Sequence, residues 1–257
     1  MCSNKKNIIN SFYYNLIMEL INDNNIVKHK KKIHIPLKKY YNENLDIFEI
    51  GVDEVGRGPL FGRVYSAAVI LPKDDSFNHS LMKDSKKFTS KTKIEEVANY
   101  IKHNSLGWCV SYEDENVVDE INILQATQKS MRKSILKLKE QMMVKENDHK
   151  QFNLLIDGNY FNPIASFNKT RNMLEVMPYV CIEGGDNKYS SIAAASILAK
   201  VERDKYIHDL CAEYPELIEK YGIDSNKGYG SKKHIDGILK YGITKWHRKS
   251  FGICKNY

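Results

Sequence analysis

Apolar residues after about position 46 recur with two different periods, which predicts strands alternating with helices. Continuous or alternating runs of β-branched and small residues, bounded by Gly, Pro or acidic residues, indicate strands. The expected strands cover residues 47–52, 64–71, 106–112, 152–156 and 176–182. We therefore expect an α/β domain with a mixed central β-sheet flanked by helices.

Spacings of three and four residues mark the expected helices. Thr89 or Ser90 is a suitable cap for a helix over residues 94–101. A long helix is expected from about Ile123 into the 140s, and a small-residue helix from about Ser191 past Asp204, whose alanines permit close packing on the sheet. The C-terminal portion is expected to be helical, and residues 159–171 read as a polar, loop-like surface excursion.

Residues 1–46 differ in amino-acid composition from the rest of the chain and are rich in Asn, Lys, Ile and Tyr. We expect them to form a basic appendage, partly helical or disordered, before a main domain over residues 47–257. The apolar residues that can line one side of a short helix are Ile8, Phe12, Leu16, Met18, Leu20 and Ile21. The basic run 28–32 is expected to be solvated, with contact to nucleic acid as the alternative. Acidic residues at 19 and 23 fit a secretory signal poorly and an organelle transit peptide only loosely.

Composition narrows the class of protein. The net charge of +7 suits a polyanionic partner, although lysine-rich surfaces also serve solubility. Five cysteines at wide spacing, with no C-x-x-C pair, favour a reducing compartment and no structural zinc. The longest apolar stretches are too short to span a bilayer. We expect a cytoplasmic protein with no membrane contact; an organelle or the nucleus is the alternative for a eukaryotic host.

Four carboxylates follow apolar runs and stand close to glycines: Asp53, Glu54, Asp157 and Asp186. We expect them to meet at one edge of the sheet. Oxygen ligands without Cys or His favour Mg²⁺ or Mn²⁺ over zinc, and two such ions can drive hydrolysis of a phosphodiester. An Asp beside a Gly is by itself most often a turn former, so only the joint occurrence points to a metal-dependent nuclease.

A glycine-rich turn follows the first acidic pair. Neighbouring side chains on a regular strand point to opposite faces, so Asp53 and Glu54 can share a site only at a strand end or bend, which Gly56 and Gly58 would permit. These glycines also let main-chain N–H groups approach a phosphate or sugar, and Arg57 adds charge. Taken alone, the segment also reads as a surface Asp-Glu pair before an ordinary turn.

Several separated blocks resemble bacterial-type ribonuclease HII, in the same order, from about residue 48 to the end. They comprise residues 51–59, Asp84-Ser85-Lys86-Lys87, Asp157-Gly158, Gly185-Asp186, residues 191–201 with Arg203-Asp204, Lys227-Gly228-Tyr229-Gly230, His234 and residues 247–252. Related ribonuclease HIII lacks the Gly-Arg-Gly turn, so the chain looks like the HII type. The catalytic subunit of the eukaryotic heterotrimeric enzyme is a more distant cousin.

The resemblance implies an RNase H-like fold and hydrolysis of the RNA strand of RNA-DNA hybrids. It also implies cutting 5' of ribonucleotides embedded in duplex DNA, with 3'-hydroxyl and 5'-phosphate ends, in ribonucleotide excision repair and RNA primer removal. The expected cofactors are two divalent ions, Mg²⁺ or Mn²⁺, and the expected state is a monomer. No clamp-binding tail follows residue 252, so recruitment by that route is not expected.

Carried over position by position, the resemblance assigns roles to individual residues. The metal-binding and catalytic carboxylates are Asp53, Glu54, Asp157 and Asp186. The residues that read the ribose 2'-hydroxyl are Gly56, Arg57 and Gly58, with Tyr229 packing on the following deoxyribose. Phosphate contacts are expected from Ser85, Lys86, Lys87 and Lys200, although each lysine also reads as a solvated charge.

Other polar residues receive supporting roles. Asp204 is interpreted as a helix-surface or supporting residue, since the family pattern gives the fourth carboxylate to Asp186. His234 and His247 can act as acid-base groups, but two-metal hydrolysis does not require them and a structural role is favoured. Gly184 stands where relatives often have Lys, and Arg63 replaces a common Pro.

Two rival functions share these features. A noncatalytic hybrid-binding module is disfavoured by the retention of all four acids. Another RNase H-like enzyme, such as a DNA strand transferase, is disfavoured by the Gly56-Arg57-Gly58 turn and Tyr229, which match ribose-reading residues.

Overall fold

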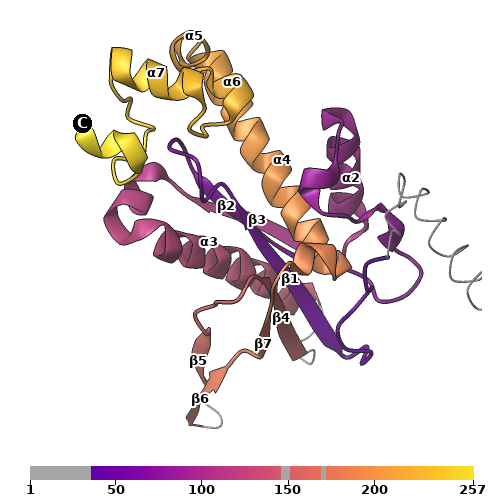
Figure 1. Ribbon diagram of the computed structural model, residues 1–257. Helices are drawn as coiled ribbons and strands as arrows, with labels where there is room; N and C mark the ends of the chain where they lie inside the picture. The colour runs from indigo at the N-terminus through magenta and orange to yellow at the C-terminus, as the bar shows by residue number, and fades with distance from the viewer. Residues whose placement is uncertain (1–35, 146–150, 169–171) are drawn as a thin grey trace, which may run out of the picture. The chain divides into compact units, whose positions relative to one another are not determined.

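A five-stranded mixed sheet forms the centre of the chain in the computed structural model, which describes residues 36–145, 151–168 and 172–257 (Figure 1). Its strand order is β3-β2-β1-β4-β7. The strands are β1 (Ile47–Val55), β2 (Val64–Ile70), β3 (Gly107–Glu113), β4 (Gln151–Asp157) and β7 (Tyr179–Ile182). β1 pairs antiparallel with β2 and parallel with β4, so the expected mixed sheet is confirmed.

Helices cover both faces of this sheet, and three more follow at the C-terminal end (Figure 1). They are α2 (Lys91–Asn104), α3 (Glu115–Lys145), α4 (Ser190–Glu213), α5 (Glu216–Tyr221), α6 (Ile223–Asn226) and α7 (Lys232–Tyr241). Alternate residues of β2 enter different cores: Ala67 and Val69 pack with α2 and α4, whereas Ala68 and Ile70 pack with α3. The period of two therefore places α3 and α4 on opposite faces.

Small residues let α4 lie almost directly on β1. Ala193, Ala194 and Ala195 are fully buried in the core that α4 shares with β2. A Cβ atom on Gly51 would lie only 2.2 Å from the carbonyl carbon of Ser191. The absence of a side chain at this position thus sets the distance between helix and strand.

The long helix α3 is divided by one residue. Asn122 has φ 67° and ψ 164°, a conformation that is not helical. Its side-chain oxygen accepts a hydrogen bond from the backbone N–H of Gln125 at 3.1 Å, so Asn122 caps the second part. The predicted start near Ile123 corresponds to this second part, and the sequence interpretation missed the turns before Asn122.

Two other predictions about secondary structure were wrong in part. The strand expected over 176–182 is two strands, β6 (Met173–Val176) and β7, separated by Met177 and Pro178. The loop expected over 159–171 contains β5 (Ala165–Asn168), which pairs with β6 in a separate two-stranded sheet. The alternation of apolar and polar residues in these segments is too short to distinguish two strands from one, or a short strand from a loop. Residues 169–171 lie outside the described residues.

Residues before β1 join the same compact unit, which covers Leu37–Tyr257. The backbone N–H groups of Tyr41 and Asn42 donate to the buried carboxylate of Glu49 at 2.8 and 2.5 Å. The domain boundary expected at residue 46 stays a prediction. The helix and basic run expected within residues 1–35 lie outside the described residues.

The expected C-terminal helices are confirmed, and they share a separate apolar core. Phe61 from the chain between β1 and β2 is fully buried there with Leu217, Ile223 and Ile238.

Among the helices of the described residues, none has the length and apolar character needed to cross a membrane.

We expect Gly51→Ala to lower the free energy of unfolding by about 2–3 kcal/mol, because the new methyl group would collide with the backbone of α4. Urea unfolding followed by circular dichroism measures this loss. Gly230→Ala is the matched control, since its Cβ would meet the nearest atom at an ordinary 3.4 Å. Equal stability of the two variants would contradict the tight contact between α4 and β1.

Candidate active site

The pairing of β1 with β4 brings two distant aspartates to one place. The last aligned pair of the parallel ladder is Val52 and Ile156, so the residues that follow them, Asp53 and Asp157, lie side by side. Val52 and Ile156 enter the core with α3, and the two aspartates therefore point to the α4 face. The prediction placed the acids after a strand ending at Val52. In the structure β1 continues to Val55, so Asp53 and Glu54 are among the last residues of the strand.

Asp53 is the most enclosed of these acids, with 5% of its surface exposed. Its Oδ1 accepts a hydrogen bond from the Glu54 backbone N–H at 2.7 Å, and Ser196 of α4 hydrogen-bonds to the same carboxyl. Burial raises the pKa of Asp53 well above its ordinary value, and the charges of Glu54 and Asp157 raise it further. A negative charge at Asp53 therefore needs compensation.

Glu54 has one partner of opposite charge. Arg57 Nη1 donates to Glu54 Oε1 at 3.1 Å across the turn. The Arg57 side chain is half exposed, whereas that of Glu54 is 15% exposed. Burial raises the pKa of Glu54; Arg57 opposes this rise and the charge of Asp157 adds to it. The ion pair ties the acidic cluster to the ribose-reading turn proposed from the sequence.

The loop after β7 completes the cluster. Gly184 takes a left-handed conformation, φ 60°, and directs the Gly185 N–H at Asp157 Oδ1, at 2.6 Å. Asp186 follows and is 6% exposed. Burial raises the pKa of Asp186, and the negative charges of Asp157 and Asp84 contribute to the rise. Asp157 thus influences each of the other three acids.

Polar residues that the sequence interpretation did not assign lie around this cluster. Asn187 Nδ2 donates to Asp186 Oδ1 at 3.0 Å and to Asp84 Oδ2 at 3.3 Å. Lys87 donates to the Asn187 side-chain oxygen. Asp84 precedes Ser85 and Asn187 follows Asp186, and both of these neighbours were predicted site residues. Position next to a predicted site residue was the only sign in the sequence that Asp84 and Asn187 lie near the site.

Ser85 and Ser196 bring the segment before α2 up to α4. Their hydroxyl oxygens are 3.0 Å apart, and both residues are buried. Lys86 lies close enough to lower the pKa of Asp186, although burial has the larger, opposite effect.

Lys200 is further along α4, where its Nζ lies 2.5 Å from Asp204 Oδ2. Asp204 is thus paired with a lysine one helical turn away.

The donor chemistry of the cluster fits a hard divalent cation. All four acids offer oxygen, and mutual repulsion together with burial raises the pKa of three of them. In residues 36–145, 151–168 and 172–257, no group of three or more His, Cys, Asp or Glu side chains stands in the geometry of a metal site. Mg²⁺ bound by carboxylates usually keeps several of its water ligands, so its binding does not require a closed cage of side chains.

One buried arginine shapes the Gly56–Gly58 turn. The guanidinium of Arg248, which is fully buried, donates to four carbonyl oxygens of this loop. The acceptors are Gly56 at 2.7 Å, Pro59 at 2.9 Å, Arg57 at 3.0 Å and, through Nε, Gly62 at 2.8 Å. Burial lowers the pKa of Arg248 to about 10, and the charge of Arg203 adds to this effect.

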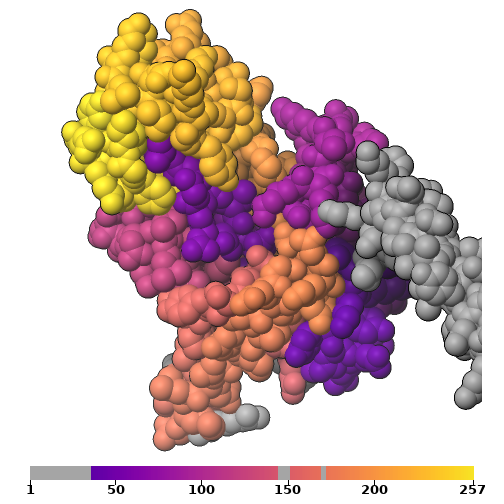
Figure 2. Space-filling model, in the orientation of Figure 1, coloured from indigo at the N-terminus to yellow at the C-terminus, as the bar shows by residue number. Residues whose placement is uncertain are grey.

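A second arginine and a tyrosine close the turn from the other side. Gly56 has φ 90°, and a Cβ there would lie 2.4 Å from Arg203 Nε. Tyr229 is half exposed and lies over Gly58, whose Cβ would be 3.4 Å from Tyr229 Cε1. The backbone N–H of Leu60 donates to the Gly228 carbonyl at 2.9 Å. Figure 2 shows the C-terminal segment, in yellow, directly against the indigo chain that contains this turn.

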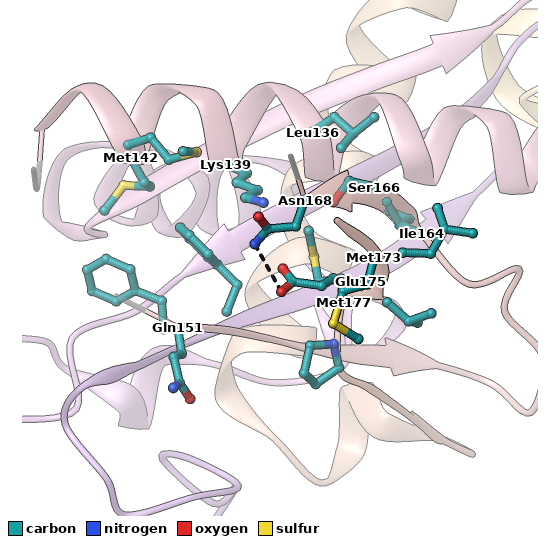
Figure 3. Close-up of a pocket in the computed structure, with 16 residues that line it drawn as sticks. Leu136, Lys139, Met142, Gln151, Ile164, Ser166, Asn168, Met173, Glu175 and Met177 are labelled. Atoms are coloured by element: carbon teal, nitrogen blue, oxygen red, sulfur yellow. Dashed lines mark hydrogen bonds between the residues drawn. The ribbon is translucent and has the colours of Figure 1, made fainter. Parts of the chain in front are cut away.

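A pocket of about 810 Å³ lies elsewhere, between α3 and the β5–β6 hairpin (Figure 3). Its lining is mainly apolar and includes Met142, Met173 and Met177. Asn168 and Glu175 are hydrogen-bonded to each other at 3.0 Å within it. None of the residues predicted for the site lines this pocket, so it is separate from the acidic cluster.

Comparisons with known proteins identify the family of this chain. The family model described as ribonuclease HII matches residues 50–254. Ribonuclease HII of Pelagibacter ubique is 44% identical over 201 residues, which are 78% of this chain and 94% of that protein.

Solved structures show the same fold at lower identity. The ribonuclease H2 of Pyrococcus horikoshii superposes with a TM-score of 0.55 at 21% identity, covering 81% of this chain and 95% of its own. A Bst-RNase HIII structure in complex with Mn²⁺ gives 0.54 at 16% identity, covering 76% and 70%. The expected RNase H-like fold is confirmed. Because the family model spans most of the sequence, the chain belongs to the ribonuclease HII family and is an endoribonuclease, a hydrolase that acts on RNA-DNA substrates.

Proposed function

We propose that this enzyme uses divalent cations to cut duplex DNA on the 5' side of an embedded ribonucleotide, as well as the RNA strand of longer hybrids. The observation that carries the proposal is the parallel register of β1 and β4, which sets Asp53 beside Asp157. The ribose-reading turn begins three residues after Asp53 in the sequence. Acids that bind cations and a turn that reads sugar thus share one sheet edge.

The chain's own residues hold and orient the reacting groups. Asp53, Glu54, Asp157 and Asp186 would bind Mg²⁺ or Mn²⁺, which when bound supplies a Lewis acid that activates water and stabilises the leaving oxygen. The Gly185 N–H fixes the Asp157 carboxylate at 2.6 Å. In the reaction, the water oxygen forms a bond to phosphorus and the bond from phosphorus to the 3'-oxygen breaks. The products are a 3'-hydroxyl and a 5'-phosphate.

Selection of the ribonucleotide is assigned to the turn and the tyrosine. The 2'-hydroxyl both donates and accepts hydrogen bonds, and the exposed main chain at Gly58 has no side chain to keep the sugar away. Gly56 lets the chain turn closely past Arg203. Arg57 is half exposed, and it would contact the substrate strand from its place beside Glu54, with which it is paired. The ring of Tyr229 would pack on the next deoxyribose, which gives a preference for a ribonucleotide followed by DNA.

Phosphate contacts would position the duplex without reading its sequence. Lys86 and Lys87 adjoin the acidic cluster, whereas Lys200 would have to exchange its pairing with Asp204 for a phosphate. Such an enzyme would serve ribonucleotide excision repair and removal of RNA primers.

A duplex with one ribonucleotide gives the direct test. With Mg²⁺ or Mn²⁺ we expect a single cut 5' of that residue, with 3'-hydroxyl and 5'-phosphate ends, and no cut in EDTA. Gel separation of labelled strands and ligation of the products identify the ends. An all-DNA duplex is the control. Cleavage that persists in EDTA would contradict the metal-dependent mechanism.

Asp157→Asn is expected to reduce the rate constant for cleavage at least about a hundredfold, because it removes a charge that stabilises the reaction. The amide oxygen can still accept from the Gly185 N–H, and loss of one negative charge relieves repulsion in the cluster. The melting temperature and the Kd for the duplex should therefore change little. Loss of folding instead of activity would make Asp157 a structural residue.

Arg57→Ala is expected to reduce about tenfold the ratio of kcat/KM for a one-ribonucleotide duplex to that for a uniform hybrid, because a charged donor beside the junction is lost. Lys205→Ala is the matched control for loss of one positive charge, since Lys205 pairs with Asp209 on the surface of α4. An unchanged ratio in Arg57→Ala would remove the role assigned to this side chain.

A further inference from the structure

Two buried histidines face each other beneath the loop that carries Tyr229. His234 of α7 and His247 are 0% and 1% exposed, and their Nε2 atoms are 3.0 Å apart. Phe61 and Tyr221 pack edge-on against the His247 ring, with ring centres 5.1 and 5.2 Å away. Neither imidazole reaches solvent, so this pair is badly placed to exchange protons with a substrate.

Hydrogen-bond partners at the two ends fix where the protons lie. The backbone N–H of Thr244 donates to His247 Nδ1 at 2.9 Å, so this nitrogen is an acceptor. In a neutral ring the proton of His247 is then on Nε2, which donates to His234 Nε2. The proton of His234 is consequently on Nδ1, which donates to the Tyr229 carbonyl oxygen at 2.9 Å.

Burial favours this uncharged state of both rings. It lowers the pKa of His247 to about 3, with a smaller contribution from His234, and it also lowers the pKa of His234. The chain of hydrogen bonds therefore runs in one direction, from Thr244 through both rings to Tyr229.

The same short segment also reaches the other half of the sugar-reading site. Arg248, directly after His247, donates to the carbonyl oxygens of Gly56 and Arg57. Phe61 forms a β-bridge with His247, which fixes the segment against the loop before β2. Residues 247 and 248 thus fix the distance between Tyr229 and the Gly56–Gly58 turn, with the Tyr229 ring over Gly58.

We propose that His247 and His234 are positioning residues that set the place of Tyr229 opposite the Gly56–Gly58 turn and thereby determine selectivity for the ribonucleotide junction. This inference rests on the function proposed above for Tyr229 and the turn. The histidines act through the tyrosine and touch neither the reacting phosphate nor the acidic cluster.

Selectivity, measured as the ratio of kcat/KM for a one-ribonucleotide duplex to that for a uniform hybrid, tests the proposal. His247→Leu removes the hydrogen bonds of this ring to His234 and Thr244 and should lower the ratio about fivefold to tenfold. His247→Gln keeps a donor near the Nε2 position and should restore most of the ratio. An unchanged ratio in His247→Leu, or equal loss in both variants, would overturn the positioning role.

A double-mutant cycle separates this inference from the proposed function. In a Tyr229→Ala background, His247→Leu should cause no further loss of selectivity, because the histidines act only through the ring that this background lacks. If Tyr229→Ala alone leaves the ratio unchanged, the proposed function of the tyrosine is wrong. If Tyr229→Ala lowers the ratio and the histidine variants do not, only the positioning inference fails.

A measurement on the unaltered protein covers the case in which the leucine variant does not fold. Nitrogen NMR of the imidazoles at neutral pH should show two uncharged rings with opposite tautomers, the proton on Nε2 in His247 and on Nδ1 in His234. A charged ring or the reverse tautomers would overturn the proposal.

Discussion

Repulsion between carboxylates that the sheet forces together is the constraint on which the site depends. The parallel register of β1 and β4 brings Asp53 next to Asp157, and the loop after β7 adds Asp186. The backbone ladder and the contact of α4 with Gly51 stabilise this arrangement at some distance from the charges. The fold thus holds together a cluster that its own electrostatics oppose, and a divalent cation is the partner that would relieve the strain.

The sheet and most helices follow from local patterns in the sequence, because each buried face repeats with the period of its element. The start of the second part of α3 was predicted near Ile123, whereas the break at Asn122 was not, since one residue in an unusual conformation leaves no periodic trace. The β5–β6 hairpin was missed for a related reason. Its short strands expose apolar residues, including Phe167 and Leu174, and so present no buried face that a longer pattern would reveal.

For the candidate site, the sequence indicated the acids but not the residues that orient them. Asp53 and Asp157 end apolar runs, a local signal. The hydrogen bond of Asn187 to Asp84 and the contact between Ser85 and Ser196 depend on segments more than 100 residues apart in the chain, which no local pattern records. Of the lysines expected near phosphate, Lys200 pairs with Asp204, a contact that its spacing of four residues permits.

The four hydrogen bonds of Arg248 also bear on the order in which the enzyme matures. The Arg248 guanidinium reaches Arg57 across 191 positions of sequence, whereas the acids that would bind cations are all present by residue 186. A nascent chain leaving the ribosome therefore carries all four acids before the turn beside them can acquire its final shape. The discrimination between sugars that we propose for this turn thus depends on a residue made after every one of the acids.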